Sequence, residues 1–259
     1  MAEVSTLEGE AKELSRLSST PIPEALMVGL AFVMGIFVQG LVLLHQDHEA
    51  FLVLVREDGL VQWLTFGELI IMAVFSFIMS YVFSQSGSGN AAKRVWLFLG
   101  FLFLFGAVEE ISWGQRILGI ESPEWFLKHN KQGEINVHNL LIHGVNINRL
   151  VFGKILAILV ALYLVVVPLA YRLSTKFTNF MNRWCIPIAQ NYQILLCLIV
   201  VLLVQPHLRL AEKAGELREL CICFVFLLVL FHPYNHELFP LKWPPLLRRK
   251  ASLGHQEGH

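Results

Sequence analysis

Apolar residues recur along the chain in long stretches that are separated by shorter polar segments. Six stretches stand out, at residues 23–44, 62–83, 95–116, 150–171, 186–205 and 217–232. Most are near the ~20 residues with which a helix crosses the ~30 Å hydrocarbon core of a bilayer, and the last is the shortest. Backbone groups inside lipid must form hydrogen bonds within their own segment, which favours helices. The pattern predicts an all-α, polytopic integral membrane protein with about six transmembrane helices.

The stretches divide the chain into three regions. Residues 1–21 form a tail that lacks the apolar core of a cleavable signal peptide. Residues 22–232 are predicted to form the six-helix transmembrane domain, with a polar loop at 117–149, and residues 233–259 form a second tail. Lys and Arg are more numerous on the side of the tails, so the positive-inside rule places both tails in the cytoplasm. We therefore expect a multi-pass protein of the cell inner (plasma) membrane.

Composition supports the membrane assignment. The chain is 55% hydrophobic and 15% charged, with a mean hydropathy of +0.58, which is too apolar for an ordinary soluble domain. The net charge is zero, so membrane lipids are the expected partners and nucleic acid is not. All six Trp residues lie at or just beyond predicted ends of the stretches, where indole rings favour the membrane interface: Trp63, Trp96, Trp113, Trp125, Trp184 and Trp243.

Two adjacent acidic residues follow the third apolar stretch. Every residue from 95 to 108 is apolar or Gly, and then come Glu109 and Glu110. Acidic residues at the end of a membrane helix are costly to bury, so each one raises a functional hypothesis. On a continuing helix, Glu109, Trp113 and Arg116 share one stripe, and Arg116 is the expected counter-ion of Glu109. Glu110 points about 100° away and has no local partner.

The most unusual polar residues share one face of the predicted membrane domain. The loops after the first, third and fifth stretches, here called loops one, three and five, lie on the same side. The residues predicted to be catalytic are Glu109, Glu110, His138 and Asn139. The residues predicted to bind substrate are Trp113, Gln115, Arg116 and Asn136. A divalent metal ion, if it is the cofactor, would take its ligands from Glu110, His138, Glu216 and Glu219.

Three functions fit carboxylates, His and Asn at one membrane face. The leading hypothesis is a membrane-embedded, hydrolase-like enzyme for a lipid or lipid-linked substrate, with Glu as the general base. The alternative is a non-catalytic membrane subunit or scaffold that docks a membrane-protein partner through loop three. A transporter or ion pathway, with the same groups as relays, is the third.

Two motifs carry a resemblance to known families. The sequence E-E-I-S-W-G-Q-R at 109–116, with N-V-H-N at 136–139, resembles the signature of a family of uncharacterised bacterial polytopic membrane proteins. The resemblance implies membership of that family, which brings no settled activity. The paired Glu followed by Arg is also partly similar to the Glu-Glu-x-x-x-Arg motif of CAAX-protease-like (CPBP) intramembrane metalloproteases, with Arg116 two residues later. This likeness implies that Glu109 and Glu110 correspond to paired catalytic glutamates.

Overall fold

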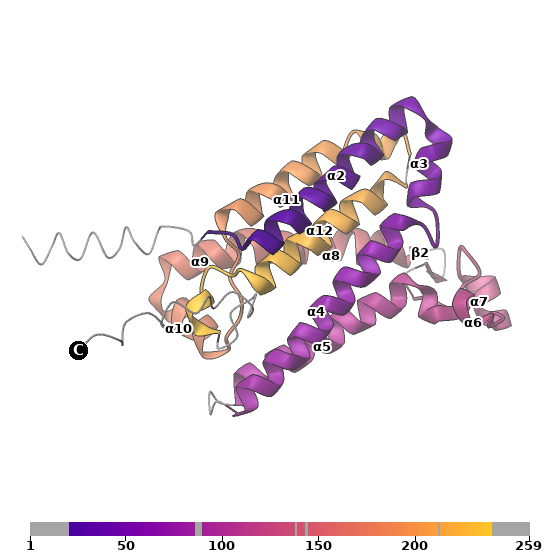
Figure 1. Cartoon of the computed structure of the whole chain (residues 1–259). Helices are drawn as coiled ribbons and strands as arrows, with labels where there is room; N and C mark the ends of the chain where they lie inside the picture. Colours follow the sequence, from indigo (N-terminus) through magenta and orange to yellow (C-terminus); the bar gives the residue numbers. More distant parts are fainter. Residues whose placement is uncertain (1–20, 86–89, 138, 143–144, 212, 240–259) are drawn as a thin grey trace, which may run out of the picture.

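The computed structural model describes residues 21–85, 90–137, 139–142, 145–211 and 213–239. Most of the chain is helical, which confirms the all-α prediction (Figure 1). Five helical runs are long and apolar enough to cross a membrane: Glu24–Gln46, His48–Gln85, Asn90–Glu110, Leu156–Leu173 and Asn191–Arg209. The first twenty residues and those after 239, which hold nearly all of the two predicted tails, lie outside the described part of the chain.

The elements follow one another in a simple order. The long helices are α2 (Glu24–Gln46), α4 (Leu60–Gln85), α5 (Asn90–Glu110), α11 (Asn191–Val204) and α12 (Ala214–Phe231). The shorter helices are α3 (His48–Val55), α6 (Gln115–Leu118), α7 (Glu124–His129), α8 (Leu156–Ala161), α9 (Val167–Leu173) and α10 (Thr175–Arg183). The remaining helical segments are η1 (Ser112–Gly114), η2 (Asn148–Ile155), η3 (Leu162–Val166), η4 (His207–Arg209) and η5 (His236–Leu238). Two short strands, β1 (Leu141–Ile142) and β2 (Val145–Asn146), pair antiparallel inside loop three.

Helices α4 and α5 pack closely as an antiparallel pair along one side of the bundle (Figure 1). Gly100 of α5 permits this approach, since a Cβ there would lie 2.6 Å from the ring of Phe77. The prediction that Trp96 lies at the membrane interface is wrong. Its ring is fully buried against Phe75, and its Nε1 donates to the carbonyl oxygen of Cys185 at 3.0 Å.

Helix α12 lies at the centre of the bundle, in contact with α2, α4 and α11 (Figure 1). Leu217, Leu220 and Leu228 of this helix are fully buried. It matches the sixth predicted stretch but is not among the five runs above, since three charged residues lie in its first two turns: Glu216, Arg218 and Glu219. Its crossing of a membrane stays a prediction.

The outer surface of the bundle is strongly apolar. Val28, Phe98 and Leu202 are 70%, 65% and 71% exposed, and many other large apolar side chains lie on the same outer faces. Contiguous apolar surface of this kind is rare on soluble monomers and is typical of proteins whose helices face lipid. The surface therefore agrees with the membrane character that the sequence predicts.

Candidate functional site

The third membrane helix ends earlier than predicted. Helix α5 stops at Glu110, and the next residues turn sharply, with φ of 49° at Ser112, 56° at Trp113 and 71° at Gly114. Positive φ is uncommon for residues other than Gly, so this break depends on contacts from elsewhere in the chain. The prediction of one continuing helix that carries Glu109, Trp113 and Arg116 on a single stripe is wrong.

Glu109 supplies one of these contacts. Its side chain is only 3% exposed. Trp113 Nε1 donates to Oε1 of Glu109 at 2.6 Å, and the backbone N–H of Val137 donates to Oε2 at 2.8 Å. The carboxylate thus fixes the break after α5 and anchors the segment that carries the predicted residues 136–139. Glu109 therefore acts as a positioning residue.

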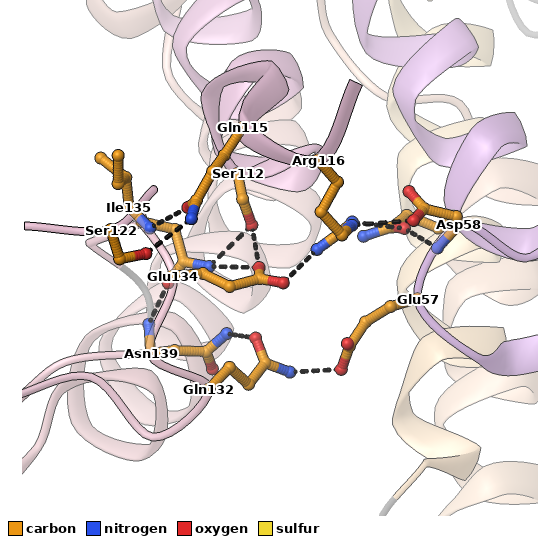
Figure 2. Close-up of polar contacts among 12 residues, drawn as sticks. Glu57, Asp58, Ser112, Gln115, Arg116, Ser122, Gln132, Glu134, Ile135 and Asn139 are labelled. Carbon is orange, nitrogen blue, oxygen red and sulfur yellow. Dashed lines mark hydrogen bonds and ion pairs between the residues drawn. The ribbon is translucent and has the colours of Figure 1, made fainter. Parts of the chain in front are cut away.

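Arg116 is the centre of a charged network between loops one and three (Figure 2). Its Nη1 bonds Oε1 of Glu134 at 2.5 Å, and its Nε bonds Oδ2 of Asp58 at 2.8 Å. Ser112 Oγ donates to the second oxygen of Glu134. The expected ion pair between Arg116 and Glu109 is replaced by these two pairs. Burial lowers the pKa of Arg116, but the hydrogen bonds that its guanidinium donates to Asp58 and Glu134, together with the two negative charges, outweigh it and raise that pKa overall.

Asn136 is hydrogen-bonded to the network around Arg116 through Ser112. It is 1% exposed, and its Nδ2 donates to Ser112 Oγ at 2.9 Å. Its Oδ1 accepts from Asn130 Nδ2 at 2.8 Å and from the backbone N–H of Asn139 at 3.2 Å. A buried amide with this many partners holds a loop in one conformation. Asn136, which is predicted to bind substrate, therefore also has a structural role in loop three.

Three further side-chain amides hold loop three together (Figure 2). Gln115 Nε2 donates to Ser122 Oγ at 2.5 Å, and its Oε1 accepts from the backbone N–H of Ile135 at 2.6 Å. Asn139 Nδ2 donates to Gln132 Oε1 at 2.5 Å, and Gln132 Nε2 donates to Glu57 of loop one at 2.7 Å. Loop three is therefore a closed, hydrogen-bonded unit that is fastened to loop one at Asp58 and Glu57.

Three predicted or neighbouring residues fall outside the described part of the chain. They are His138, to which catalytic and metal-binding roles were assigned, and His143 and Glu212. Trp113 lies within the described part and is 50% exposed, with its indole N–H held by Glu109. Its predicted contact with substrate stays a prediction.

Glu110 differs from its neighbour. Its backbone carbonyl accepts from Gln62 Nε2 at 2.6 Å, which joins the end of α5 to the start of α4. Its side chain forms no hydrogen bond or ion pair within the described residues, but it interacts electrostatically with Glu219, Glu216 and Lys213 of the α12 end. The structure thus brings Glu216 and Glu219 towards Glu110, as their shared membrane face suggested.

A small pocket opens between the end of α3 and Lys213, the residue before α12. It has a volume of about 350 Å³ and is lined by Leu52, Arg56, Glu57 and Lys213. Lys213 Nζ lies 3.7 Å from Glu57 and 3.8 Å from Glu216. Across the described ranges, no group of three or more His, Cys, Asp or Glu side chains is arranged to hold a metal ion. His138, the fourth member of the predicted metal set, lies outside the described residues.

The sequence predictions missed one buried carboxyl group. Glu68 lies inside α4, is 7% exposed, and its Oε2 is buried without a hydrogen-bond partner within the described residues. Leaving a buried polar group unsatisfied costs about 1–3 kcal/mol. The sequence does contain an indication of this group, because Glu68 is the single charged residue of α4. An ionisable residue within a membrane span is a functional candidate by default.

Comparisons with known proteins do not assign the chain. No protein-family model, curated protein or solved structure matches it. The two family resemblances stay predictions, and function rests on the geometry of the site.

Proposed function

We propose that this chain is a multi-pass protein of a bacterial inner membrane, with both termini in the cytoplasm. We propose further that it is a hydrolase-like enzyme acting on a lipid or lipid-linked substrate at the face of loops one, three and five. The observation that carries this proposal is the pocket of Arg56 and Lys213, since Lys213 also interacts electrostatically with Glu110. A cation site and a free carboxylate thus lie at the same end of the bundle.

The pocket suits an anionic head group. Its volume of about 350 Å³ is at the lower end of ligand sites, which commonly run from about 300 to 1,000 Å³. Arg56 and Lys213 would pair with phosphate or carboxylate oxygens, because charge-assisted hydrogen bonds are the strong ones. Leu52 would face the apolar part of the same molecule. Glu57, paired with Lys213, would favour substrates that can compete for that cation.

Glu110 is the residue to which we assign the general base. A base must lie within a hydrogen bond, or one water, of the proton that it removes. Among the residues predicted to be catalytic, Glu109 and Asn139 are bonded within loop three, so we assign them positioning roles. Glu109 holds the N–H of Val137, the residue before His138, and would thereby position His138 as the acid. The metal-binding role of Glu110, His138, Glu216 and Glu219 remains an alternative use of the same groups.

The test is turnover of lipids by purified protein in bilayer discs made from a bacterial phospholipid extract, followed by mass spectrometry. We expect Glu110→Gln to lower kcat by about 10²-fold or more, the usual contribution of a general base. Arg56→Ala and Lys213→Ala should raise KM. Lys128→Ala is the matched control, because Lys128 is a 70% exposed cation of loop three outside the pocket. Full turnover by a folded Glu110→Gln protein would overturn the assignment.

A scaffold is the second candidate, and a specific surface favours it. Exposed apolar side chains gather on the rigid loop three: Trp113, Ile117, Leu118, Trp125 and Leu127. A rigid loop with an apolar surface is suited to docking a membrane-protein partner or resting on lipid. Purification of a stoichiometric partner that is lost in Ile117→Ser/Leu118→Ser protein, together with absent lipid turnover, would favour the scaffold over the enzyme.

A further inference from the structure

Glu68 lies deep in the bundle, away from loop three. It is about 12 Å along the axis of α4 from Leu60, at ~1.5 Å rise per residue. Its side chain is more than nine-tenths buried, and its Oε2 has no hydrogen-bond partner within the described residues. The bonds around Glu109 and Glu134 show that this chain can satisfy a buried carboxylate, yet it does not do so for Glu68.

The titratable groups around Glu68 come from the central helix. Its neighbours on α12 are the thiols of Cys221 and Cys223, which interact with it electrostatically. Cys223 also interacts with Glu110, at the end of α5, and with Glu219, one turn earlier on α12. Carboxyl groups from three helices therefore interact electrostatically with Cys223, and Glu219 is exposed at the loop-five end of the bundle. Within the described residues, Glu68 forms no ion pair with a Lys, Arg or His side chain.

Beyond Glu68, towards the opposite end of the bundle, aromatic side chains pack beside α4. Phe75 lies about 10 Å further along α4, at ~1.5 Å per residue. Its ring is 4.2 Å from that of Phe231 and 5.8 Å from that of Trp96, measured between ring centroids. Phe75, Trp96 and Phe231 are all buried. Cys223 thus couples Glu68 electrostatically to carboxyl groups near the face of loops three and five. Towards the opposite end lie buried aromatic side chains, and the buried hydroxyl of Ser76 is satisfied by the carbonyl oxygen of Met72.

We infer that Glu68 is an intramembrane proton-binding site that exchanges its proton with the face of loops three and five. The proton is the ligand that the surroundings fit, because a carboxyl group without a cation or hydrogen-bond donors is far less costly to bury as the neutral acid. A metal ion would need further ligands, and the described residues do not gather a set of three. The site goes beyond the proposed enzyme, whose base is Glu110 on another helix.

The first test is labelling with dicyclohexylcarbodiimide, which reacts with protonated carboxyl groups in apolar surroundings. The acid proton passes to a carbodiimide nitrogen, the carboxylate oxygen bonds to the central carbon, and the acyl group then shifts from oxygen to nitrogen. All atoms of both reactants remain in the adduct. At neutral pH we expect one adduct on the α4 peptide that contains Glu68, and its loss in Glu68→Gln protein. Glu110→Gln protein should keep the adduct, which separates this inference from the proposed enzyme.

The second test is infrared spectroscopy and does not depend on access of the reagent. Wild-type protein at neutral pH should show the C=O band of a protonated carboxyl, and Glu68→Gln protein, with unchanged helicity and elution volume, should lack it. Glu219→Gln should slow the shift of this band in D₂O, because it alters the route to the face. Identical bands in the wild-type and Glu68→Gln proteins, or a Glu68 band that appears only in acid, would overturn the inference.

Discussion

Buried carboxyl groups of this protein lie in two regions that differ in hydrogen bonding. Around loop three, Glu109 at the end of α5 and Glu134 in the loop are 3% and 9% exposed, and both oxygens of each accept hydrogen bonds. At the junction of α4, α5 and α12, the side chains of Glu68 and Glu110 form no hydrogen bond or ion pair within the described residues. A bonded carboxylate stabilises a loop, whereas an unbonded one is retained at a cost. The first region is therefore structural, and the second is where we place the proposed chemistry.

The largest loss of stability should come from removing Arg116, which is the centre of the hydrogen-bonded region around loop three. Arg116→Met removes the cation that Glu134 and Asp58 share. Loss of one partner from a buried ion pair costs about 3–5 kcal/mol, and Arg116 is partly exposed, so we expect a loss of about 2–4 kcal/mol. Chemical unfolding in mild detergent measures this change.

The control for that substitution is Lys128→Met. Lys128 pairs with Glu124, but both side chains are largely exposed, at 70% and 88%. Exposed pairs contribute about 0–1 kcal/mol, so this variant should unfold almost like the wild type. Equal losses in the two variants would show that the network around Arg116 does not hold loop three.

Glu109 and Glu110 are adjacent in the sequence, and the first has a hydrogen-bonded carboxyl group whereas the second does not within the described residues. Glu109→Gln places an amide N–H₂ against the N–H of Trp113 or of Val137, and we expect a loss of about 1–3 kcal/mol. Glu110→Gln breaks no side-chain hydrogen bond within the described residues and should leave stability nearly unchanged. Unfolding measures both, and hydrogen exchange should show lost protection of the Val137 amide in Glu109→Gln protein alone. If Glu110→Gln lost stability and Glu109→Gln did not, Glu110 would have the structural role and Glu109 would be the candidate for chemistry.

The membrane helices could be predicted from the sequence, because apolar length alone encodes them. The break after Glu110 could not. Ser112 and Trp113 adopt positive φ because Glu134 and Glu109 bond their side chains, and Glu134 lies far along the chain. The predicted ion-pair partner of Arg116, Glu109, is wrong for the same reason, since the actual partners Asp58 and Glu134 come from two different loops.

Glu68 could have been found from the sequence, as the single charge of an apolar helix. Its surroundings could not, because α12 approaches α4 from the far end of the chain. Proximity of Glu219 and Glu216 to Glu110 was expected from their shared face, and the electrostatic interactions agree with it. The central position of α12 depends on tertiary packing that the periodicity of its residues does not encode.

Glu68→Met should have a smaller effect, and of the opposite sign. The substitution replaces an unsatisfied carboxyl with an apolar side chain of similar volume, so we expect a gain of about 1 kcal/mol. Thermal unfolding in detergent measures it. Ser76→Ala on the same helix is the matched control, since the buried Ser76 hydroxyl is satisfied by the carbonyl of Met72 at 2.7 Å. A marked loss of stability in Glu68→Met would mean that Glu68 has a structural partner after all.

The smallest change in stability should come from Glu57→Gln at the pocket. Lys213 and Glu57 lie 3.7 Å apart and are 38% and 42% exposed, so their pair contributes less than about 1 kcal/mol. A Gln at this position keeps the oxygen that accepts from Gln132 Nε2, so loop three stays fastened to loop one. Removal of the negative charge frees Lys213 for an anionic ligand. We therefore expect near-native unfolding together with a lower KM for an anionic lipid, and a higher KM would remove Lys213 from the binding site.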